Sequence, residues 1–547
     1  MRDIEIPLFK ARHGKRTPLY RFFEILPAVM SIGAVVLLVI FSIFSPIAAA
    51  IYILVIVILV FVRAIGIAIR VIQGHGTIKK TQQVDWKKWL AELEDPAKFA
   101  KIRQSDVDSR DFRMRQHALN LQHLAEIDGE SPKPSQIYNV VIIPFYNESY
   151  DVWEPTLNTL KNNDYDVKNK MIVVVAYEER GGQAALDTVA KIKENWQGVF
   201  RELFFVEHPA NIPDEVVGKG GNITFAGKFI ANWVKEQGID PDNVIVTTQD
   251  CDNQPHKKYF SYLTYEWIMT PNRQRVAFQP VCLFLDNIWD VPAPVRVVAA
   301  GNSFWNMISS MRPHQLRNFA SHSQGLAALI GMNFWSTRTI VEDGHQYWRS
   351  YFYFNGDYSV VPLRITYGQS AVSSTGYGKT LKAQFIQLRR WDYGASDVPF
   401  VATKLLKRGH KIGFFAGWTR FARLLEGHIT LACIAPIVAF GAWLPIVLNK
   451  QAAHQSVLVN DLPLIVSQIQ QVAVIGLFVS IFISLIMLPP RPKRYRKSKW
   501  FAMILQWLLM PVTSIVYSSL CAYSAQMRLA TGHYLSKFDV SDKVIKK

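Results

Sequence analysis

Three short stretches of the chain carry side chains that could act together in a reaction. They are Asp250-Cys251-Asp252, Glu342-Asp343 and the run QLRRW at residues 387–391. Carboxylates bind divalent cations and accept protons, whereas arginine binds phosphate and tryptophan stacks on the apolar face of a sugar. Such a set of side chains is suited to moving a sugar from a nucleoside diphosphate to an acceptor.

The two aspartates of the first stretch follow a β-branched run at residues 244–248, which predicts a strand. Both carboxylates would therefore emerge from a strand end into a loop. Proteins commonly hold Mg²⁺ through one or two carboxylates together with the phosphate oxygens of the substrate, and a metal stabilises the charge that grows on a leaving diphosphate. We expect Asp250 and Asp252 to hold Mg²⁺ or Mn²⁺. A short acidic surface loop is the alternative.

A carboxylate of Glu342-Asp343 could accept the proton of a sugar hydroxyl as that hydroxyl attacks the anomeric carbon. The alternative is that this pair caps a helix that begins close to Gln346. His322 and His345 are expected to be ordinary hydrogen-bonded histidines, because no second His or Cys lies at metal-binding spacing.

The run QLRRW predicts a phosphate-binding and sugar-binding helix face. Helical spacing brings Gln387 and Arg390 together, and Trp391 can face a neighbouring ring. The alternative is a basic helix end with a buried tryptophan. Lys219 lies in a glycine-rich turn, residues 218–222, that lacks the spacing of a P-loop. It either contacts the diphosphate or belongs to a flexible turn.

The elements that would position these stretches follow an α/β pattern. Short β-rich runs lie at residues 138–144, 171–176, 199–206 and 244–248, and buried parallel strands typically consist of such runs, rich in Val and Ile without polar alternation. Ligands of open parallel sheets bind beyond the carboxyl ends of the strands. Asn147-Glu148, Tyr177-Glu178 and Asp250 follow such strands, so we expect them to meet at one edge of the sheet.

Apolar runs on both sides of this region indicate membrane helices. Residues 25–69 are nearly all apolar, with Ser45-Pro46 near the middle, which predicts a hairpin of two spans. Three further runs lie at about 427–448, 471–489 and 500–523. The odd total of five would place the tail outside the cell, unless the last run, broken by Pro511, re-enters instead of crossing.

The composition fits a membrane protein with a soluble part. The chain has 547 residues, 50% of them hydrophobic, and a mean hydropathy of +0.08. The formal charge of +18 could indicate nucleic acid, an anionic membrane or phosphorylated substrates. The basic residues cluster beside the apolar runs, in a positive-inside pattern, so nucleic acid is not an expected partner. Four cysteines without CxxC spacing indicate a reducing compartment.

The chain is therefore expected to be of the α/β class, with a nucleotide-sugar-binding domain inserted between transmembrane α-helices. The expected parts are a basic segment and transmembrane hairpin (1–75), a juxtamembrane helical linker (76–137), a cytoplasmic catalytic domain (138–400), interfacial amphipathic helices (401–426), transmembrane helices (427–525) and a tail (526–547).

Taken in order, the motifs resemble those of the membrane-embedded glycosyltransferase family 2, the processive type to which cellulose and hyaluronan synthases belong. The series comprises residues 143–148, Lys219-Gly220, Asp250–Asp252, Glu342-Asp343 and 387–391, and the likeness covers roughly residues 138–425. The resemblance implies a GT-A fold, inversion at the anomeric carbon, and a nucleotide-sugar donor, which we expect to be a UDP-sugar.

The resemblance also implies roles for single residues. Asp252 would bind the metal, Asp250 would contact metal or nucleotide, and Asp343, paired with Glu342, would be the general base. The remaining assignments are Gln387, Arg390 and Trp391 to the diphosphate and acceptor, and Pro144, Tyr146, Glu148 and Lys219 to the nucleotide pocket. The family usually has an aspartate after the second strand, where this chain has Glu178. The tail at 538–543 resembles a closing segment that is cytosolic in some members.

The leading hypothesis is a metal-dependent, inverting hexosyltransferase of the cell membrane that extends a polysaccharide and exports it through its helices. One alternative is a single transfer to a lipid carrier. Another, from a different class, is a nucleotide-binding membrane transporter or scaffold, which the scarcity of ionisable residues in the apolar runs disfavours. Expected partners are the donor, a carbohydrate or lipid-linked acceptor, membrane lipids and an accessory membrane or export protein.

Overall fold

The computed structural model describes residues 4–8, 16–127, 129, 131–407 and 409–535. The tail motif at 538–543 lies outside the described residues. The chain divides into two compact units, each made of several segments. The first unit comprises Met1–Ile4, Gly76–Cys282 and Arg312–Gln369, and the second comprises Glu5–His75, Leu283–Met311 and Ser370–Lys547.

The first unit is built on a mixed eight-stranded sheet with the strand order β3-β2-β1-β4-β7-β6-β8-β5. Its parallel part consists of β1 (Tyr138–Phe145), β2 (Met171–Glu178), β3 (Glu202–His208) and β4 (Val244–Thr248). These four strands lie at the four β-rich runs, although β3 begins at Glu202, three residues later than expected. The chain is thus α/β in this unit, as expected.

The remaining strands make the sheet mixed, which the sequence pattern did not predict. They are β5 (Gln254–Pro255), β6 (Val276–Leu283), β7 (Ser323–Gly325) and β8 (Ser359–Gly368). The strand β7 runs antiparallel to both β4 and β6, and β5 runs antiparallel to β8. Antiparallel strands therefore border the carboxyl end of β4, where the acidic loop begins.

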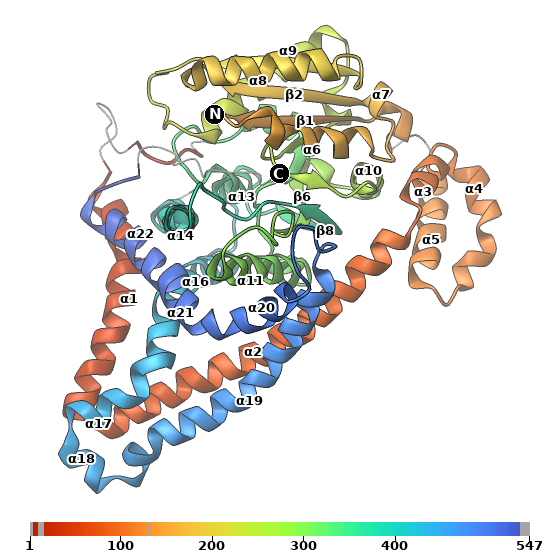
Figure 1. Ribbon diagram of the computed structural model, residues 1–547. Helices are drawn as coiled ribbons and strands as arrows, with labels where there is room; N and C mark the ends of the chain where they lie inside the picture. The colour runs from red at the N-terminus through yellow and green to blue at the C-terminus, as the bar shows by residue number, and fades with distance from the viewer. Residues whose placement is uncertain (1–3, 9–15, 128, 130, 408, 536–547) are drawn as a thin grey trace. The chain divides into compact units, whose positions relative to one another are not determined.

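Helices α8 and α9 lie along the parallel strands, as Figure 1 shows. The helices of this unit that position the site are α6 (Tyr150–Lys161), α8 (Gly182–Trp196), α9 (Lys219–Glu236), α10 (Tyr259–Met269) and α13 (Glu342–Tyr353). Shorter or peripheral helices are α3 (Trp86–Glu92), α4 (Pro96–Ile102), α5 (Phe112–Glu126), α7 (Val167–Lys170) and α12 (Leu326–Gly331). Helix α9 packs against β1, β2 and β3.

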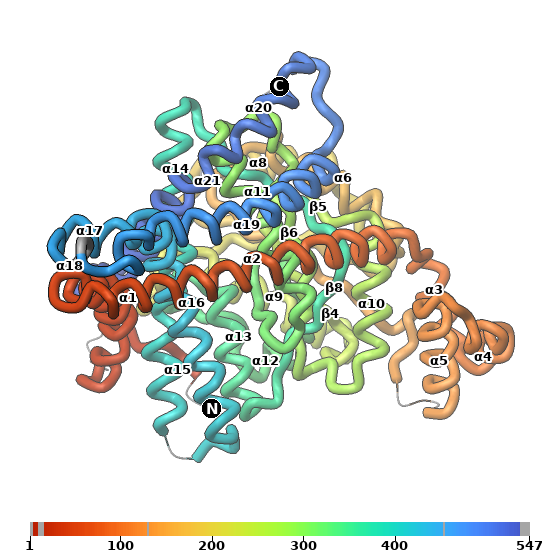
Figure 2. Tube along the Cα trace, turned by 90° about the horizontal axis from the view of Figure 1, so that it is seen from below, coloured from red at the N-terminus to blue at the C-terminus, as the bar shows by residue number. Residues whose placement is uncertain are grey.

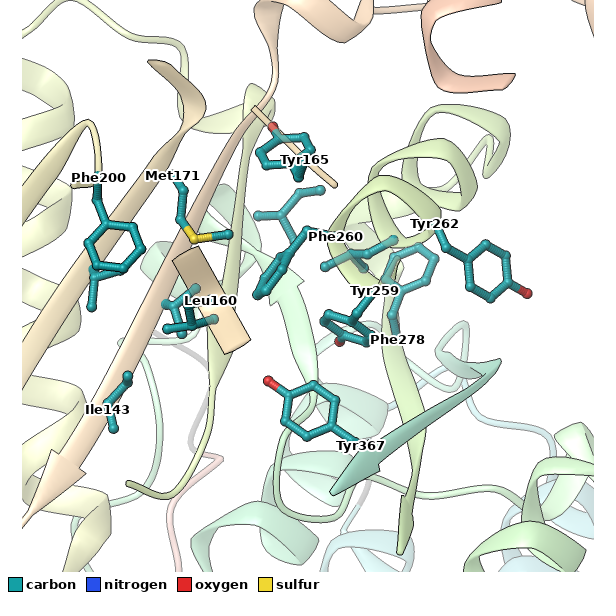
Figure 3. Close-up of a cluster of buried hydrophobic side chains, with 14 of the residues drawn as sticks. Ile143, Leu160, Tyr165, Met171, Phe200, Tyr259, Phe260, Tyr262, Phe278 and Tyr367 are labelled. Atoms are coloured by element: carbon teal, nitrogen blue, oxygen red, sulfur yellow. The ribbon is translucent and has the colours of Figure 1, made fainter. Parts of the chain in front are cut away.

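One large apolar core holds the sheet and its helices together (Figure 3). Alternate residues of β1, such as Ile143, face Leu160 of α6 in this core. On α10, the ring of Tyr262 stacks on Trp86 of α3 with centroids 4.1 Å apart. Aromatic pairs of this kind add to the stabilisation from burial alone, so α3 is anchored to the sheet through α10.

In the second unit lie the apolar helices, and within the described part of the chain five helices are long and apolar enough to cross a membrane. They are α1 (Pro18–Phe44), α2 (Pro46–Gln83, which continues into the first unit), Phe414–Leu448, α19 (Val457–Met487) and Lys499–Thr531. Within Phe414–Leu448, α16 (Phe414–Phe440) is followed by α17 (Leu444–Leu448). The other helices of this unit are α11 (Ala293–Ser310), α14 (Tyr377–Asp392), α15 (Asp397–Leu406) and α18 (Lys450–Gln455).

Helices α1 and α16 run in the same direction. Near their starts the rings of Phe23 and Phe421 lie 5.9 Å apart, and near their middles the thiol of Cys433 donates to the backbone oxygen of Ser31 at 3.2 Å. At the far end, Asn449 donates to the backbone oxygen of Ile43 at 2.9 Å. The two helices therefore start on one face of the bundle and end on the other.

Helices α2 and α19 return in the opposite direction and lie side by side in both views (Figures 1 and 2). The α2 helix begins two residues after α1 ends. A Cβ atom placed on Gly476 of α19 would lie 3.7 Å from the backbone oxygen of Ala64 in α2. Small residues at such a contact let two helix backbones approach closely.

Candidate active site

Three distant segments of the first unit meet at the side chain of Lys219, the first residue of α9. Its Nζ lies 2.8 Å from Oδ1 of Asp250 and 3.9 Å from Oε1 of Glu342. The acidic loop after β4, the start of α9 and the start of α13 therefore share one site. Two of the three chemistry-bearing stretches of the sequence are brought together here, and Lys219 lies between them.

The loop that carries Asp250 and Asp252 is fixed by hydrogen bonds on both sides. The hydroxyl of Thr156 in α6 donates to the backbone oxygen of Cys251 at 2.7 Å, and the Asn253 amide donates to Ser321 Oγ at 2.6 Å. The side chain of Asp250 is 39% exposed, whereas Asp252 is buried. Both carboxylates thus lie on a hydrogen-bonded turn just beyond the carboxyl end of β4.

Glycine at position 220 permits the close approach of α9 to the segment before α13. A Cβ atom on Gly220 would lie 2.3 Å from the backbone oxygen of Ser336 and 3.3 Å from the Cβ of Glu342. The first turn of α9 is also tied to the end of β2, because the amide of Asn222 donates to the backbone oxygen of Ala176 at 2.8 Å. These contacts set the position of Lys219.

The acidic pair Glu342-Asp343 forms the first turn of α13. Glu342 is buried, and Oδ1 of Asp343 accepts from the backbone amide of Gly344 at 2.7 Å. Carboxylates are stabilised at this end of a helix by its dipole and its unpaired amides. The helix-terminal position that was the structural alternative is therefore present, and it coexists with the approach of Glu342 to Lys219.

The carboxylates of this site change the pKa values of Lys219 and Cys282. Burial alone would lower the pKa of the Lys219 ammonium, but Asp250, Glu342 and Asp343 together raise it above its ordinary value. Lys219 is therefore a permanent cation among carboxylates. Burial also raises the pKa of the Cys282 thiol to about 12, with Asp250 and Asp343 adding to the effect, so this thiol is unreactive at neutral pH.

His322 is a buried, neutral, hydrogen-bonded residue that interacts electrostatically with Asp343 and Lys219. Its Nδ1 donates to the backbone oxygen of Phe319 at 2.8 Å, and its Nε2 accepts from the indole of Trp335 at 3.3 Å. Burial lowers the pKa of His322 to about 4. The expectation of an ordinary histidine is confirmed at this position.

The candidates for the nucleotide pocket follow β1 and β2. Pro144 pairs with Ala176 in the sheet, and one oxygen of Glu148 accepts from the backbone amides of Tyr146 (2.9 Å) and Asn147 (3.2 Å). Because β1 and β2 are adjacent and parallel, the segments that follow them start from the same edge of the sheet.

Arg180 links these candidates and was missed by the sequence interpretation. It forms an ion pair with Glu178, and its guanidinium carbon lies 4.7 Å from the ring centroid of Tyr146. Burial raises the pKa of the Glu178 carboxyl, and Arg180 opposes that rise. A Cβ atom on Gly181 would lie 2.0 Å from the Tyr146 backbone oxygen, so this glycine allows the approach. The position of Arg180 just past a strand end was the available signal.

The residues of QLRRW lie on α14 in the second unit. The amide of Gln384 donates to Oε1 of Gln387 at 3.2 Å, and Arg390 follows one turn later on the same helix. Trp391 is 37% exposed, with its ring centroid 5.7 Å from that of Phe284. A purely structural helix end would require a buried tryptophan, whereas Trp391 is partly exposed.

The acidic loop fits a divalent cation in the type and number of its oxygen ligands. Among the described residues, no three His, Cys, Asp or Glu side chains are grouped as a metal cluster. Asp250 and Asp252 offer hard oxygen ligands from a single turn. Mg²⁺ and Mn²⁺ accept such partial sets and complete their coordination with phosphate oxygens and water.

Comparisons with known proteins give distant structural similarities alone. No family model and no curated protein matches the chain. A solved structure of the mannosyltransferase PcManGT from Pyrobaculum calidifontis in complex with GDP-Man and Mn²⁺ is 13% identical, with a TM-score of 0.37, and the match covers 77% of this chain and 98% of that one. S. aureus TarS is 11% identical with a TM-score of 0.30, covering 59% and 55%.

A second structure, of S. aureus TarS residues 1–349, is 12% identical with a TM-score of 0.32, covering 74% of this chain and 95% of that one. The chain thus spans about half of the length of the longer TarS structure. TM-scores below 0.5 do not establish a common fold, so the activity proposed below follows from the residues of the site.

Proposed function

We propose that this protein is a membrane-bound, inverting glycosyltransferase that takes a sugar from a nucleoside diphosphate donor. The observation that carries this proposal is the convergence of Asp250, Lys219 and Glu342-Asp343 at one site beyond the sheet edge. A transfer of this kind requires a cationic place for the diphosphate and a carboxylate base beside it. The site supplies both within one unit of the chain.

The reaction assigns one proton and two bonds to these residues. Asp343 accepts the proton of the acceptor hydroxyl while the hydroxyl oxygen forms a bond to the anomeric carbon. The bond between that carbon and the diphosphate oxygen breaks, and the electron pair leaves with the diphosphate. Attack from the face opposite the leaving group inverts the configuration. Glu342 stands next to the base and holds Lys219 in place.

Lys219 and the acidic loop hold the donor. In the structure the ammonium of Lys219 forms an ion pair with Asp250. When the donor binds, Lys219 would instead contact the phosphate oxygens, and Asp250 would instead contact the metal ion. Asp250 and Asp252 would hold Mg²⁺ or Mn²⁺, which when bound stabilises the negative charge of the leaving diphosphate. Tyr146, Glu148 and Glu178, with Pro144 beside them, are assigned to the nucleoside.

The second unit supplies the membrane context and the acceptor residues of the proposal. We assign Gln387, Arg390 and Trp391 to the diphosphate and the acceptor sugar, since an exposed indole can stack on a sugar ring. The helices that could cross a membrane favour a product of the lipid phase or an exported polysaccharide. Transfer of one sugar to a lipid carrier remains the second candidate, because it uses the same donor site.

The test is sugar transfer by the purified full-length chain. Radiolabelled UDP-sugars and GDP-sugars are offered with Mg²⁺ or Mn²⁺ in the presence of membranes, and the product is sized. A ladder into high mass supports the polysaccharide, one added sugar supports the lipid carrier, and no transfer from any donor contradicts the proposal. Asp343→Asn should abolish turnover, whereas Asp187→Asn, an exposed carboxylate of α8, should not. Undiminished turnover in Asp343→Asn would remove the base assignment.

A further inference from the structure

The last apolar stretch of the chain, residues 499–531, starts and ends on the same face of the helix bundle. It starts next to the end of α19, where the indole of Trp289 donates to the backbone oxygen of Pro489 at 3.0 Å and lies 5.2 Å from the ring of Trp500. Because α19 runs antiparallel to α1, this is the face on which α1 begins. Figure 1 shows α20 (Lys499–Leu505), α21 (Met510–Ser514) and α22 (Leu520–Thr531) running from there toward the start of α1.

The stretch ends at the first turn of α1. The guanidinium of Arg21 donates to the backbone oxygens of Leu529 (2.9 Å) and Ala530 (2.8 Å) and to the hydroxyl of Tyr534 (2.7 Å). That hydroxyl in turn donates to Glu24 at 3.0 Å, which also pairs with Arg21. A cation at the carbonyl end of a helix is favoured by the helix dipole, so this polar cluster fixes the end of α22 beside the start of α1.

Between its ends, the stretch goes only a short way down the bundle. Of the hydrogen bonds between this stretch and α1 among the described residues, the one furthest along α1 runs from the hydroxyl of Tyr523 to the backbone oxygen of Ser31 at 3.3 Å. Ser31 lies six residues beyond Ile25, where the apolar run of α1 begins, which corresponds to about 9 Å of helix. The hydrocarbon core of a bilayer is about 30 Å thick, so this depth is about a third of a crossing.

The helical path is also broken, as a shallow route along a surface requires. It consists of α20 (Lys499–Leu505), a 3₁₀ turn (Gln506–Leu509), α21 (Met510–Ser514), a π turn (Ile515–Ser519) and α22 (Leu520–Thr531). Turns of these types, and proline at position 511, change the direction of a helix.

One side of the stretch packs on helices that carry charge. The hydroxyl of Tyr517 donates to the backbone oxygen of Leu381 at 3.3 Å, and the thiol of Cys521 donates to that of Phe385 at 3.5 Å, both in α14. That helix carries Lys379, Lys382, Arg389 and Arg390. A crossing helix would draw these side chains into hydrocarbon, at a cost of about 3 kcal/mol each near the centre.

The other side of the stretch exposes large apolar side chains. Phe501, Leu508 and Val512 are 65%, 77% and 59% exposed. The loop before it is basic, with Arg491, Lys493, Arg494, Arg496 and Lys497, and the stretch itself begins with Lys499. Asp290 binds Arg494 at 2.8 Å. Apolar side chains that follow a cluster of basic residues match the boundary between anionic headgroups and acyl chains.

We propose that residues 499–531 lie in one interface of an anionic bilayer and do not cross it. Of the described helices, α1, α2, α16 and α19 then cross the membrane, and α22 ends on the face where α1 begins. The positive-inside rule makes this face the cytosolic one. Under this proposal the last of the five apolar runs does not cross the membrane, and it ends on the side where it starts.

The first test maps the sides of the membrane in the full-length protein. Single cysteines replace exposed residues in a background without the four native, buried cysteines. The variants are Thr17→Cys before α1, Ser45→Cys between α1 and α2, and His533→Cys after α22. An impermeant maleimide should label Thr17→Cys and His533→Cys in vesicles of one orientation and Ser45→Cys in the other. Labelling of His533→Cys together with Ser45→Cys would overturn the proposal.

A second measurement does not depend on the orientation of the protein in vesicles. It therefore still tests the proposal if one of the cysteine variants fails to insert. Spin labels at Phe501, Leu508 and Val512 are compared with labels at Val472, Phe478 and Ile486 of α19 in phosphatidylglycerol-containing nanodiscs. Accessibility to oxygen and to a water-soluble nickel chelate reports depth. The first three labels should share one shallow depth, while the α19 labels should change depth steadily. A steady change in the first series, through the bilayer centre, would contradict the proposal.

Discussion

The ammonium nitrogen of Lys219 lies 2.8 Å from Oδ1 of Asp250, a residue that is 31 positions away in the sequence. This ion pair joins the start of α9 to the loop after β4, and Glu342 stands 3.9 Å from the same ammonium. A buried cation shared by several carboxylates keeps their charges compatible at close range. Lys219 is thus the residue on which the geometry of the proposed donor site depends.

Replacing Lys219 with methionine should therefore impair the reaction more than it impairs folding. The change keeps the volume of the side chain but leaves Asp250, Glu342 and Asp343 without their cation, so we expect kcat/KM for the donor to fall at least tenfold, which is about 1.4 kcal/mol. Steady-state transfer assays measure it. Lys228→Met, at an exposed position of the same helix, serves as the control, and equal activities of the two variants would refute the role of Lys219.

Gly220→Ala should destabilise the first unit, because the new methyl carbon would lie 2.3 Å from the backbone oxygen of Ser336. Backbone atoms cannot move aside as a flexible side chain can, so we expect a loss of about 1–3 kcal/mol. Denaturant unfolding of the full-length protein in detergent, followed through tryptophan fluorescence, provides the measurement. At Gly76 a Cβ atom meets nothing within 4 Å, and Gly76→Ala should leave stability unchanged or slightly raised.

Strands β1, β2 and β4 could be predicted from the sequence because they are buried on both faces and are rich in Val and Ile, whereas β3 is only partly buried and was predicted from its β-rich composition. The same rule missed β7, whose three residues, Ser323–Gly325, are polar or small. That strand exists only because β4 and β6 lie on either side of it. A strand that forms only through pairing with its neighbours has no pattern in its own sequence. Sequence periodicity therefore could not predict β7 or the mixed character that it gives to the sheet.

The site could be predicted in part for a related reason. Carboxylates that follow a strand end are visible in the sequence, and Asp250 and Glu342 do share a site with Lys219. The packing of Arg180 over the ring of Tyr146 depends instead on the close approach of Gly181 to the Tyr146 backbone, which no residue pattern predicts. Side-chain chemistry is thus readable from the sequence, whereas contacts between turns require coordinates.

The pH dependence of stability should contain a contribution from His322. Its folded-state pKa of about 4 lies below the ordinary value of 6.5, so the folded protein binds a proton there less readily than the unfolded chain does. The stabilisation is complete above pH 6.5 and is lost as the pH falls toward 4, by up to about 3 kcal/mol. Unfolding free energies of the wild type and of His322→Asn, measured between pH 4 and 7.5, report this difference.

The asparagine amide can still donate to the backbone oxygen of Phe319, as Nδ1 of His322 does, but it has no proton to gain in this range. The difference in free energy between wild type and variant should therefore narrow or reverse at low pH. His256, whose pKa burial also lowers to about 4, contributes equally to both proteins and cancels. A difference that stays constant across the range would show that His322 does not titrate on unfolding.

Asp252→Asn should raise the concentration of Mn²⁺ that half-maximal transfer requires. The substitution preserves the size of the side chain and replaces a charged oxygen ligand with a neutral amide, which binds a hard dication less strongly. We expect at least a tenfold increase, with partial recovery of turnover at high Mn²⁺, and complete loss of wild-type activity in a chelator that added Mn²⁺ reverses. Transfer assays across a series of free Mn²⁺ concentrations give these values, with Asp187→Asn as the matched exposed control.

Because Asp252 is buried on a turn held by Thr156 and Ser321, the variant's unfolding transition is measured alongside. An unchanged Mn²⁺ requirement in a variant of normal stability would mean that the metal, if used, is held elsewhere.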